Sequence, residues 1–287
     1  MIPAAVEYTR PSSIEGVVEV LADEDAKVLA GGQSLIPLLR LRLAAPSVLV
    51  DLGGLADLRG VREDGDDLVI GAMTPHATVL RDPLVARYAP LLAQATGTVG
   101  DRQVRHLGTI GGSLAHADPA GDLPAVSLAL DAAMEVTGPS GTRSIPATEF
   151  FVDYLTTALQ PGEVLTAVRV PKRERWASHY LKFNRVAQAW ALVGVAALVR
   201  RDNGSIAEAR IGLANMGPTP LRASAAEAAL RDAPAGPGAV AEAARHATEG
   251  TSPTDDLSAS AGYRGHLARV LTERAVLACL PESSRAA

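Results

Sequence analysis

Two of the three pairs of adjacent glycines constrain this chain more than any other feature. Gly31-Gly32 lies in "LAGGQSLIP", after a short apolar run and before a segment with a helical pattern. Gly111-Gly112 lies in "GTIGGSL", ahead of another apolar run. Glycine adopts positive φ readily and lets another molecule approach bare backbone N–H groups. A glycine turn between a strand and a helix therefore suits an anion such as phosphate, although a single pair is more often a tight turn without a ligand.

Strand and helix patterns surround both pairs. The strand-like runs of the first third are residues 26–30, 47–52 and 66–73. Residues 34–43 fit a short helix with Ser34 as its N-cap. Residues 83–100 fit a helix interrupted at Pro90, and residues 121–136 fit a helix that leads into a strand. The second glycine pair connects these two later segments.

The chain changes character near residues 170–180, where charged residues follow a strand-like run. Two strand patterns come next, and Asn203-Gly204 is typical of a hairpin turn. The remainder, about residues 222–280, is rich in alanine and has a helical pattern. We therefore expect a β-meander followed by helices, in a second α+β domain that begins near residue 175.

Composition limits the classes of partner. Lys and Arg number 27 against 32 Asp and Glu, and no basic run is present, so a nucleic-acid or anionic-membrane surface is not expected. The longest apolar run, residues 189–199, is shorter than the roughly 20 residues that cross a bilayer. The first residues lack the apolar segment of a secretory signal, so we expect a cytoplasmic protein. Cys279 is the only cysteine, which excludes an internal disulfide and an iron–sulfur cluster built on this chain alone.

The two glycine turns together suggest a dinucleotide site. Thr109 and Ser113 add hydroxyls on either side of Gly111-Gly112. Two such turns could hold the two phosphates of a dinucleotide from opposite sides, which one turn could not do. The chain has neither the G-x-G-x-x-G pattern of a Rossmann fold nor a G-x-x-x-x-G-K-[ST] loop. A dinucleotide clamp of another architecture is therefore the hypothesis.

Other chemistry near the second turn is less well supported. His106, His116, Asp118 and Asp122 are possible metal ligands, but the two histidines are not spaced as a helical i, i+4 pair. Neither Ser34 nor Ser113 lies in a G-x-S-x-G motif, which argues against a serine hydrolase.

Two charged residues have open alternatives. Asp122 is either the N-cap of the following helix or an acceptor for a ligand hydroxyl. Lys182 alternates with Tyr180 and Asn184 on one face of a strand. It is either a solvated side chain or a cation that stabilises the negative charge of a reduced flavin.

Four segments occur in an order and spacing typical of one family. They are "AGGQSLIPLLRLRL", "RHLGTIGGSLAHADPAGDLP", "PGEVLTAVRVP" and "HYLKFNRVAQAWALVGVAA". Together they resemble the FAD-binding medium subunit of molybdenum hydroxylases, a family that includes the carbon monoxide dehydrogenase medium subunit and the flavin domain of xanthine dehydrogenase. The similarity runs along nearly the whole chain.

The resemblance implies an α+β protein of two domains. Residues 1–174 would form a two-lobed FAD-binding domain of the vanillyl-alcohol-oxidase (PCMH) type, with lobes of about 1–56 and 57–174. Residues 175–287 would form the C-terminal domain of carbon monoxide dehydrogenase flavoproteins, with a three-stranded sheet and helices.

The resemblance also implies where FAD binds without a covalent link. The stretches that match the two glycine turns bind FAD in the family, in agreement with the clamp hypothesis. The backbone at Val99 and Gly100, the acidic Asp122 and the basic Lys182 match further FAD positions. The full set of expected contacts, which contains no catalytic and no metal-binding residue, is Ala30, Gly31, Gly32, Gln33, Ser34, Leu35, Val99, Gly100, Thr109, Ile110, Gly111, Gly112, Ser113, Asp122 and Lys182.

The implied role is electron transfer within a complex. A large molybdenum-cofactor subunit would oxidise the substrate, a small subunit would pass electrons through 2Fe-2S clusters, and FAD on this chain would deliver them to an external acceptor. The complex would be a dimer of heterotrimers, that is, a heterohexamer. Ser113, Asn184 and Ala189 stand where many relatives have other residues, so the resemblance implies different contacts for those three side chains. The alternatives are a self-sufficient flavin dehydrogenase or oxidase, for which no substrate base is evident, and a flavin-free scaffold.

Overall fold

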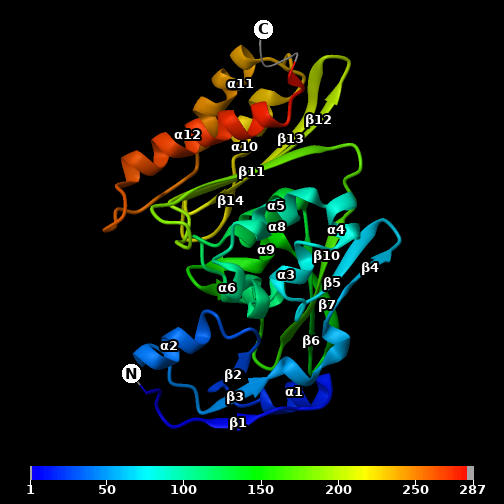
Figure 1. Ribbon diagram of the computed structural model, residues 1–287, viewed down its shortest axis with the longest axis vertical. Helices are drawn as coiled ribbons and strands as arrows, with labels where there is room; N and C mark the ends of the chain where they lie inside the picture. The colour runs from blue at the N-terminus through cyan, green and yellow to red at the C-terminus, as the bar shows by residue number, and fades with distance from the viewer. Residues whose placement is uncertain (1, 283–287) are drawn as a thin grey trace.

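The computed structural model describes residues 2–282, which form three parts along the long axis of the molecule (Figure 1). The first part, with α2 (Leu35–Leu41), lies at one end. The middle part holds the largest sheet, and the last part carries the long helix α12 (Ala261–Ala278) at the other end. Within residues 2–282, no helix has the length and apolar character that a bilayer crossing needs.

A parallel three-stranded sheet forms the first part. Its strand order is β1-β3-β2, and α2 supplies the crossover between the parallel neighbours β2 and β3. The strands and helix expected over residues 26–52 are thereby confirmed. The remaining bounds are β1 (Glu7–Thr9), α1 (Ile14–Val20), β2 (Ala26–Leu29) and β3 (Val48–Asp51).

An antiparallel five-stranded sheet forms the middle part, in the order β4-β5-β10-β6-β7. The central strand β10 comes from late in this part and pairs with both β5 and β6. A two-stranded ribbon, β8 with β9, precedes β10 in the chain. The bounds are β4 (Val61–Asp64), β5 (Asp67–Gly71), β6 (Ala133–Gly138), β7 (Gly141–Pro146), β8 (Phe151–Asp153), β9 (Thr156–Thr157) and β10 (Val164–Pro171).

Short helices pack against this sheet. α7 and α8 contact β10, and α4 contacts β5. The helix expected over residues 83–100 is divided as predicted, because Pro90 opens α5 directly after α4 ends. The bounds are α3 (His76–Val79), α4 (Pro83–Tyr88), α5 (Pro90–Gly97), α6 (Arg102–Leu107), α7 (Ile110–His116), α8 (Asp122–Leu130) and α9 (Ala147–Phe150).

The last part is a β-meander covered by helices, as expected. Its strand order is β11-β12-β13-β14, and the hairpin turn between β12 and β13 has positive φ at both Asn203 (45°) and Gly204 (85°). The sheet has four strands where three were expected, because the two-residue strand β14 adds to its edge. The bounds are β11 (Ala177–Phe183), β12 (Val193–Asp202), β13 (Ser205–Ala214), β14 (Leu221–Arg222), α10 (Ser224–Leu230) and α11 (Pro237–Ala244).

Helix α8 joins the middle and last parts. All nine of its residues are buried, because it contacts β10 on one side and β12 and β13 on another. Gly212 of β13 makes this approach possible, since a Cβ there would lie 2.1 Å from the carbonyl oxygen of Ala125. Tyr180 and Leu198 belong to the same apolar cluster as the leucines of α8. The core therefore continues across the junction of the two parts.

Candidate cofactor site

The first glycine turn leaves four backbone N–H groups free. The amides of residues 31–34 have no acceptor within residues 2–282, and the side chain of Gln33 donates to the Gly31 carbonyl at 3.0 Å. Gly32 has a φ of +71°, which favours glycine. Ser34 precedes α2 as expected, but its backbone is already helical and its hydroxyl accepts no capping hydrogen bond. Four free amides and a free hydroxyl in one turn suit an anionic group.

The second glycine turn is different, because the protein itself uses its amides. Gly111 donates to the Ala72 carbonyl at 2.8 Å, and Ile110 donates to the Thr74 carbonyl at 3.1 Å. Thr109 is the N-cap of α7 and accepts from the Gly112 amide at 3.1 Å. The expectation that this turn offers bare amides is therefore wrong for residues 110–113. What it leaves to a ligand is the Thr109 amide and the Ser113 hydroxyl, neither of which has a hydrogen-bond partner in the part of the chain that the structure describes.

The two turns lie against each other although about 80 residues separate them. A Cβ on Gly31 would lie 2.2 Å from the carbonyl oxygen of Leu107 and 2.6 Å from the Cα of Gly108. A Cβ on Gly112 would lie 3.4 Å from the Cβ of Ala30. Gly31 is thus needed for the close approach of the two backbones, and the structure brings together the two stretches that the sequence predicted as a clamp.

A buried histidine, which the sequence did not single out, supports the second turn. The His76 amide donates to the Gly108 carbonyl at 2.9 Å, and the ring packs against Gly108. Its side-chain Nδ1 is buried without a partner among residues 2–282. Burial, and then the positive charge of Arg105, lower the pKa of His76 to about 4, so the ring is neutral at physiological pH. No local pattern around His76 signals this position.

Val99 and Gly100 lie in the turn between α5 and α6. Their carbonyl oxygens accept hydrogen bonds from Arg105 at 2.8 and 3.3 Å. Gly100 has a φ of +47°. The preceding carbonyl, that of Thr98, accepts from the Lys182 ammonium at 3.2 Å. The turn is thus held from α6 and from β11.

Asp122 and Lys182 form a buried ion pair. The Lys182 Nζ lies 2.9 Å from the Asp122 Oδ2, and the two side chains are 5% and 3% exposed. The Tyr180 hydroxyl donates to the Asp122 Oδ1 at 2.5 Å, and burial, then Asp122, raise the pKa of Tyr180. The N-cap interpretation of Asp122 is wrong, because Gly121 is the N-cap and Asp122 the first helical residue. The solvated-lysine interpretation of Lys182 is also wrong.

The histidines near the second turn do not gather. His106 is exposed on α6, whereas His116 ends α7 with its ring 6.4 Å from that of Trp190. Burial lowers the pKa of His116. Asp118 accepts from the Ala120 amide at 2.9 Å. In residues 2–282, no three His, Cys, Asp or Glu side chains are grouped as metal ligands.

Asn184 and Ala189, two of the residues expected to differ from the family, lie in an exposed turn. Asn184 donates to the Val186 carbonyl at 2.8 Å, and the Ala189 amide donates to the same carbonyl at 3.0 Å. Val186 and Trp190 extend into solvent, with exposed fractions of 65% and 52%.

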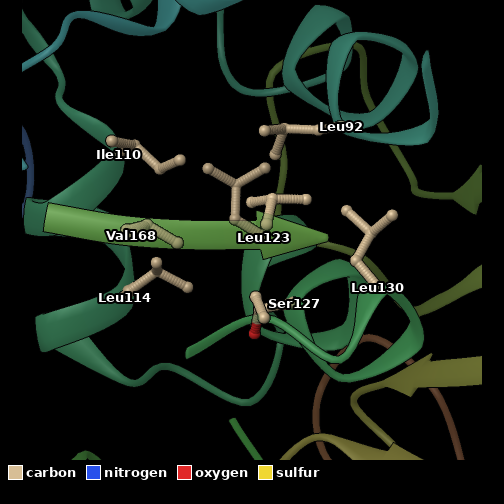
Figure 2. Close-up of a pocket in the computed structure, with 9 residues that line it drawn as sticks. Leu92, Ile110, Leu114, Leu123, Ser127, Leu130 and Val168 are labelled. Atoms are coloured by element: carbon tan, nitrogen blue, oxygen red, sulfur yellow. The ribbon is translucent and has the colours of Figure 1, made fainter. Parts of the chain in front are cut away.

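A small internal void lies beneath the second turn, and Figure 2 shows the side chains around it. Its volume is about 10 Å³, room for about one water, and all but one of its lining side chains are apolar. The exception, Ser127, donates its hydroxyl to the Pro124 carbonyl at 2.7 Å. This void cannot hold a cofactor, so the candidate site is the surface formed by the two turns.

Known proteins resemble the chain over nearly its full length. The family described as "FAD binding domain in molybdopterin dehydrogenase" matches residues 4–173, and the "CO dehydrogenase flavoprotein C-terminal domain" matches residues 178–279. The carbon monoxide dehydrogenase medium chain of Hydrogenophaga pseudoflava is 39% identical over 96% of this chain and 97% of its own. The alpha subunit of the 6-hydroxypseudooxynicotine dehydrogenase complex of Paenarthrobacter nicotinovorans is 36% identical over 98% and 96%. The solved carbon monoxide dehydrogenase of H. pseudoflava has a chain that superposes with a TM-score of 0.95, at 41% identity, covering 97% of this chain and 98% of that one.

Proposed function

This chain belongs to the family of FAD-binding medium subunits of molybdenum hydroxylases, and from that membership we infer its place in such a complex. It carries FAD and transfers electrons, which reach it from 2Fe-2S clusters on a partner chain and leave it to an external acceptor. The self-sufficient oxidase and the flavin-free scaffold have no observation in their favour.

The contact between the two glycine turns carries the assignment of the site. Residues 31–34 present four free amides, and Gly31 allows the second turn to lie beside them. This arrangement fits the two negative charges of a pyrophosphate. The proposed FAD contacts are the residues of the first turn, Ala30, Gly31, Gly32, Gln33, Ser34 and Leu35, and those of the second, Thr109, Ile110, Gly111, Gly112 and Ser113. Val99, Gly100, Asp122 and Lys182 complete the proposed set.

The residues of this chain bind and orient FAD, and they do not themselves react. A bound FAD supplies the redox chemistry, because it takes up electrons singly and releases them in pairs. The first turn holds the anionic part through its amides, while the Thr109 cap fixes the direction of α7. Asp122 and Lys182 neutralise each other, so the proposed contacts from this pair add no net charge beside the flavin.

The expected partner chains are those that carry the cofactors this chain has no ligands for. Cys279 is the only cysteine and is buried, so cluster ligands have to come from another chain. We propose a large molybdenum-cofactor subunit and a small 2Fe-2S subunit as partners, assembled as a dimer of heterotrimers in the cytoplasm. The name "medium chain" carried by the relatives supports this composition. We also propose that the FAD-binding domain ends at residue 174, with lobes of about 1–56 and 57–174, and that residues 175–287 form the second domain.

Expression of the chain alone and with its partner chains tests this function. The chain alone should purify with one FAD and oxidise no organic substrate, and the complete complex should reduce an artificial acceptor when its substrate is added. Substrate oxidation by the chain alone would contradict the subunit assignment. A colourless chain that takes up no added FAD would contradict the flavoprotein assignment.

A further inference from the structure

A second site candidate lies where the middle and last parts meet, away from the glycine turns. A groove of about 520 Å³ is lined by Asp66, Tyr88, residues 172–176 and Arg200. Its volume is within the roughly 300–1,000 Å³ that small-molecule sites occupy. None of these residues belongs to the proposed FAD contacts.

The groove concentrates positive charge in an acidic chain. Four cationic side chains line it, Lys172, Arg173, Arg175 and Arg200, against two carboxylates, Asp66 and Glu174. Three of the four are paired with carboxylates outside the lining, Lys172 with Glu63, Arg173 with Asp131 and Arg200 with Glu208, whereas Arg175 has no ion pair in the described residues. Over the whole chain the balance is the reverse, with 27 basic and 32 acidic residues. A local surplus of cations against the overall charge favours an anionic ligand.

The indole of Trp176 organises the guanidinium groups. Arg173, Arg200 and Arg210 each have their guanidinium carbon 5.4 to 5.9 Å from the centre of the Trp176 ring. A guanidinium over an aromatic face keeps its N–H edge available for bidentate contacts with phosphate or carboxylate. Trp176 therefore orders arginine side chains without neutralising them.

The carboxylates near these arginines do not match them in number. Three carboxylates are paired with four arginines: Asp131 with Arg173, Arg210 and Arg222, Glu208 with Arg200 and Arg210, and Glu227 with Arg222. The Nε of Arg173 is buried without a partner in the described residues. Burial, and then the positive charge of Arg222, lower the pKa of Arg210. These four arginines thus keep a surplus of one positive charge over their paired carboxylates.

The backbone of the lining turn is fixed before any ligand arrives. The Lys172 amide donates to the Asp66 carbonyl at 2.9 Å, and the Arg173 amide donates to the Tyr88 carbonyl at 3.0 Å. The Trp176 amide closes the turn on the Arg173 carbonyl at 3.2 Å. Binding in this groove therefore needs little ordering of the chain.

We propose that this groove binds a small multivalent anion that carries phosphate or carboxylate groups. Arg175 and Arg200 are the most accessible donors, since Arg175 has no acidic partner in the described residues and Arg200 is 42% exposed. The binding is separate from that of FAD.

Fluorine NMR of the FAD-loaded full chain tests the proposal. The chain has two tryptophans, so labelling with 5-fluorotryptophan gives two signals, which Trp176→Phe and Trp190→Phe assign. Pyrophosphate and citrate are the probes, titrated at constant ionic strength with sodium chloride as the reference. We expect the Trp176 signal to shift saturably while the Trp190 signal stays. One probe acting alone identifies phosphate or carboxylate as the recognised group.

Three variants decide whether the groove is the cause. Arg175→Gln and Arg200→Gln should each weaken binding by about tenfold, since each removes a charged hydrogen-bond donor. Arg201→Gln is the matched control, because Arg201 is the exposed neighbour of Arg200 and does not line the groove. FAD content, followed by absorbance, should stay the same in all three.

Equal weakening by Arg201→Gln, or no shift of the Trp176 signal with either anion, overturns the proposal. A Trp176 shift that appears only when partner chains are added also overturns it and identifies a subunit interface.

Discussion

Gly31 and Gly111 have matching sequence contexts but different surroundings. A Cβ on Gly31 would strike the backbone at Leu107, on the neighbouring turn. A Cβ on Gly111 would lie 2.5 Å from the Cβ of Ala72, inside the core. The first glycine therefore sets the distance between the two turns, and the second sets the depth of α7 in the fold.

Replacement of Gly31 by alanine should release FAD. The added Cβ would lie 2.2 Å from the Leu107 carbonyl oxygen, so the turns must separate and the free amides lose their position. We expect the flavin content of the purified variant to fall from one per chain to less than about a tenth, because each loss of about 1.4 kcal/mol weakens binding tenfold and repeated washing then removes the cofactor. Absorbance of flavin against protein measures it.

Gly238→Ala is the control for this change. Gly238 lies in α11, and a Cβ added there would have no neighbour within 4 Å, so the substitution should leave FAD bound. Full flavin content in Gly31→Ala would contradict the role given to the contact between the turns.

His76 should make stability depend on pH. The pKa of its buried ring is about 4, against 6.5 in the unfolded chain, so only the unfolded chain takes up a proton between these values. Stability is therefore unaffected above pH 6.5 and falls as the pH drops to 4, by about 3 kcal/mol in total. We expect His76→Gln to remove this part of the slope in urea unfolding between pH 7 and 4. The exposed His106 provides the control, and a His76→Gln slope equal to that of His106→Gln would refute the prediction.

At the scale of elements, the sequence predicts those helices, strands and turns that apolar periodicity and turn residues determine. The strands β2, β3 and β5, the helix pair divided at Pro90 and the hairpin at Asn203-Gly204 all follow from local patterns. The helix α3 does not follow from them, because its four residues are too few to show the helical repeat of apolar positions. Its start depends on tertiary contact, since Pro75 forms an isolated bridge with Thr109. Tertiary contacts also take up the amides of Ile110 and Gly111 in the second turn, which is why the sequence could locate that turn but could not show which of its donors stay free.

Packing between α7, α8 and β10 leaves room for one more methylene group. Val168 of β10 lines the void of about 10 Å³ in Figure 2. Val168→Ile should raise the free energy of unfolding by up to about 1 kcal/mol, because the added group is buried where no atom has to move far. Urea unfolding measures the change. Val136→Ile, a buried β6 position away from the void, should lower stability through overpacking, and equal effects of the two would contradict the role of the void.

At the scale of the whole molecule, the two halves of the chain share charged groups as well as a core. Asp122 begins α8 in the middle part, whereas Lys182 and Tyr180 belong to β11 in the last part. The sequence indicates the strand face that Tyr180 and Lys182 share, but not that it faces Asp122, because that depends on how the parts pack. The family resemblance predicts that Asp122 and Lys182 lie near the cofactor, but it does not predict their contact with each other.

The Asp122–Lys182 pair should stabilise the junction of the two parts. Lys182→Met leaves a buried carboxylate whose one remaining side-chain partner within residues 2–282 is the Tyr180 hydroxyl, which typically costs about 3–5 kcal/mol. Asp122→Asn in addition to Lys182→Met should recover much of this loss, because no buried charge then remains. Urea unfolding of the three proteins without FAD gives the coupling between the two positions. Arg245→Met, at the exposed pair with Glu242, should change stability by less than about 1 kcal/mol and serves as the control.

The flavin content of the same variants separates two roles of the Asp122–Lys182 pair. If the double variant regains stability but not FAD, the pair contacts the cofactor directly. If it regains both, the pair acts by holding the two parts together. A Lys182→Met protein as stable as Arg245→Met would show that the buried pair does not hold the two parts together.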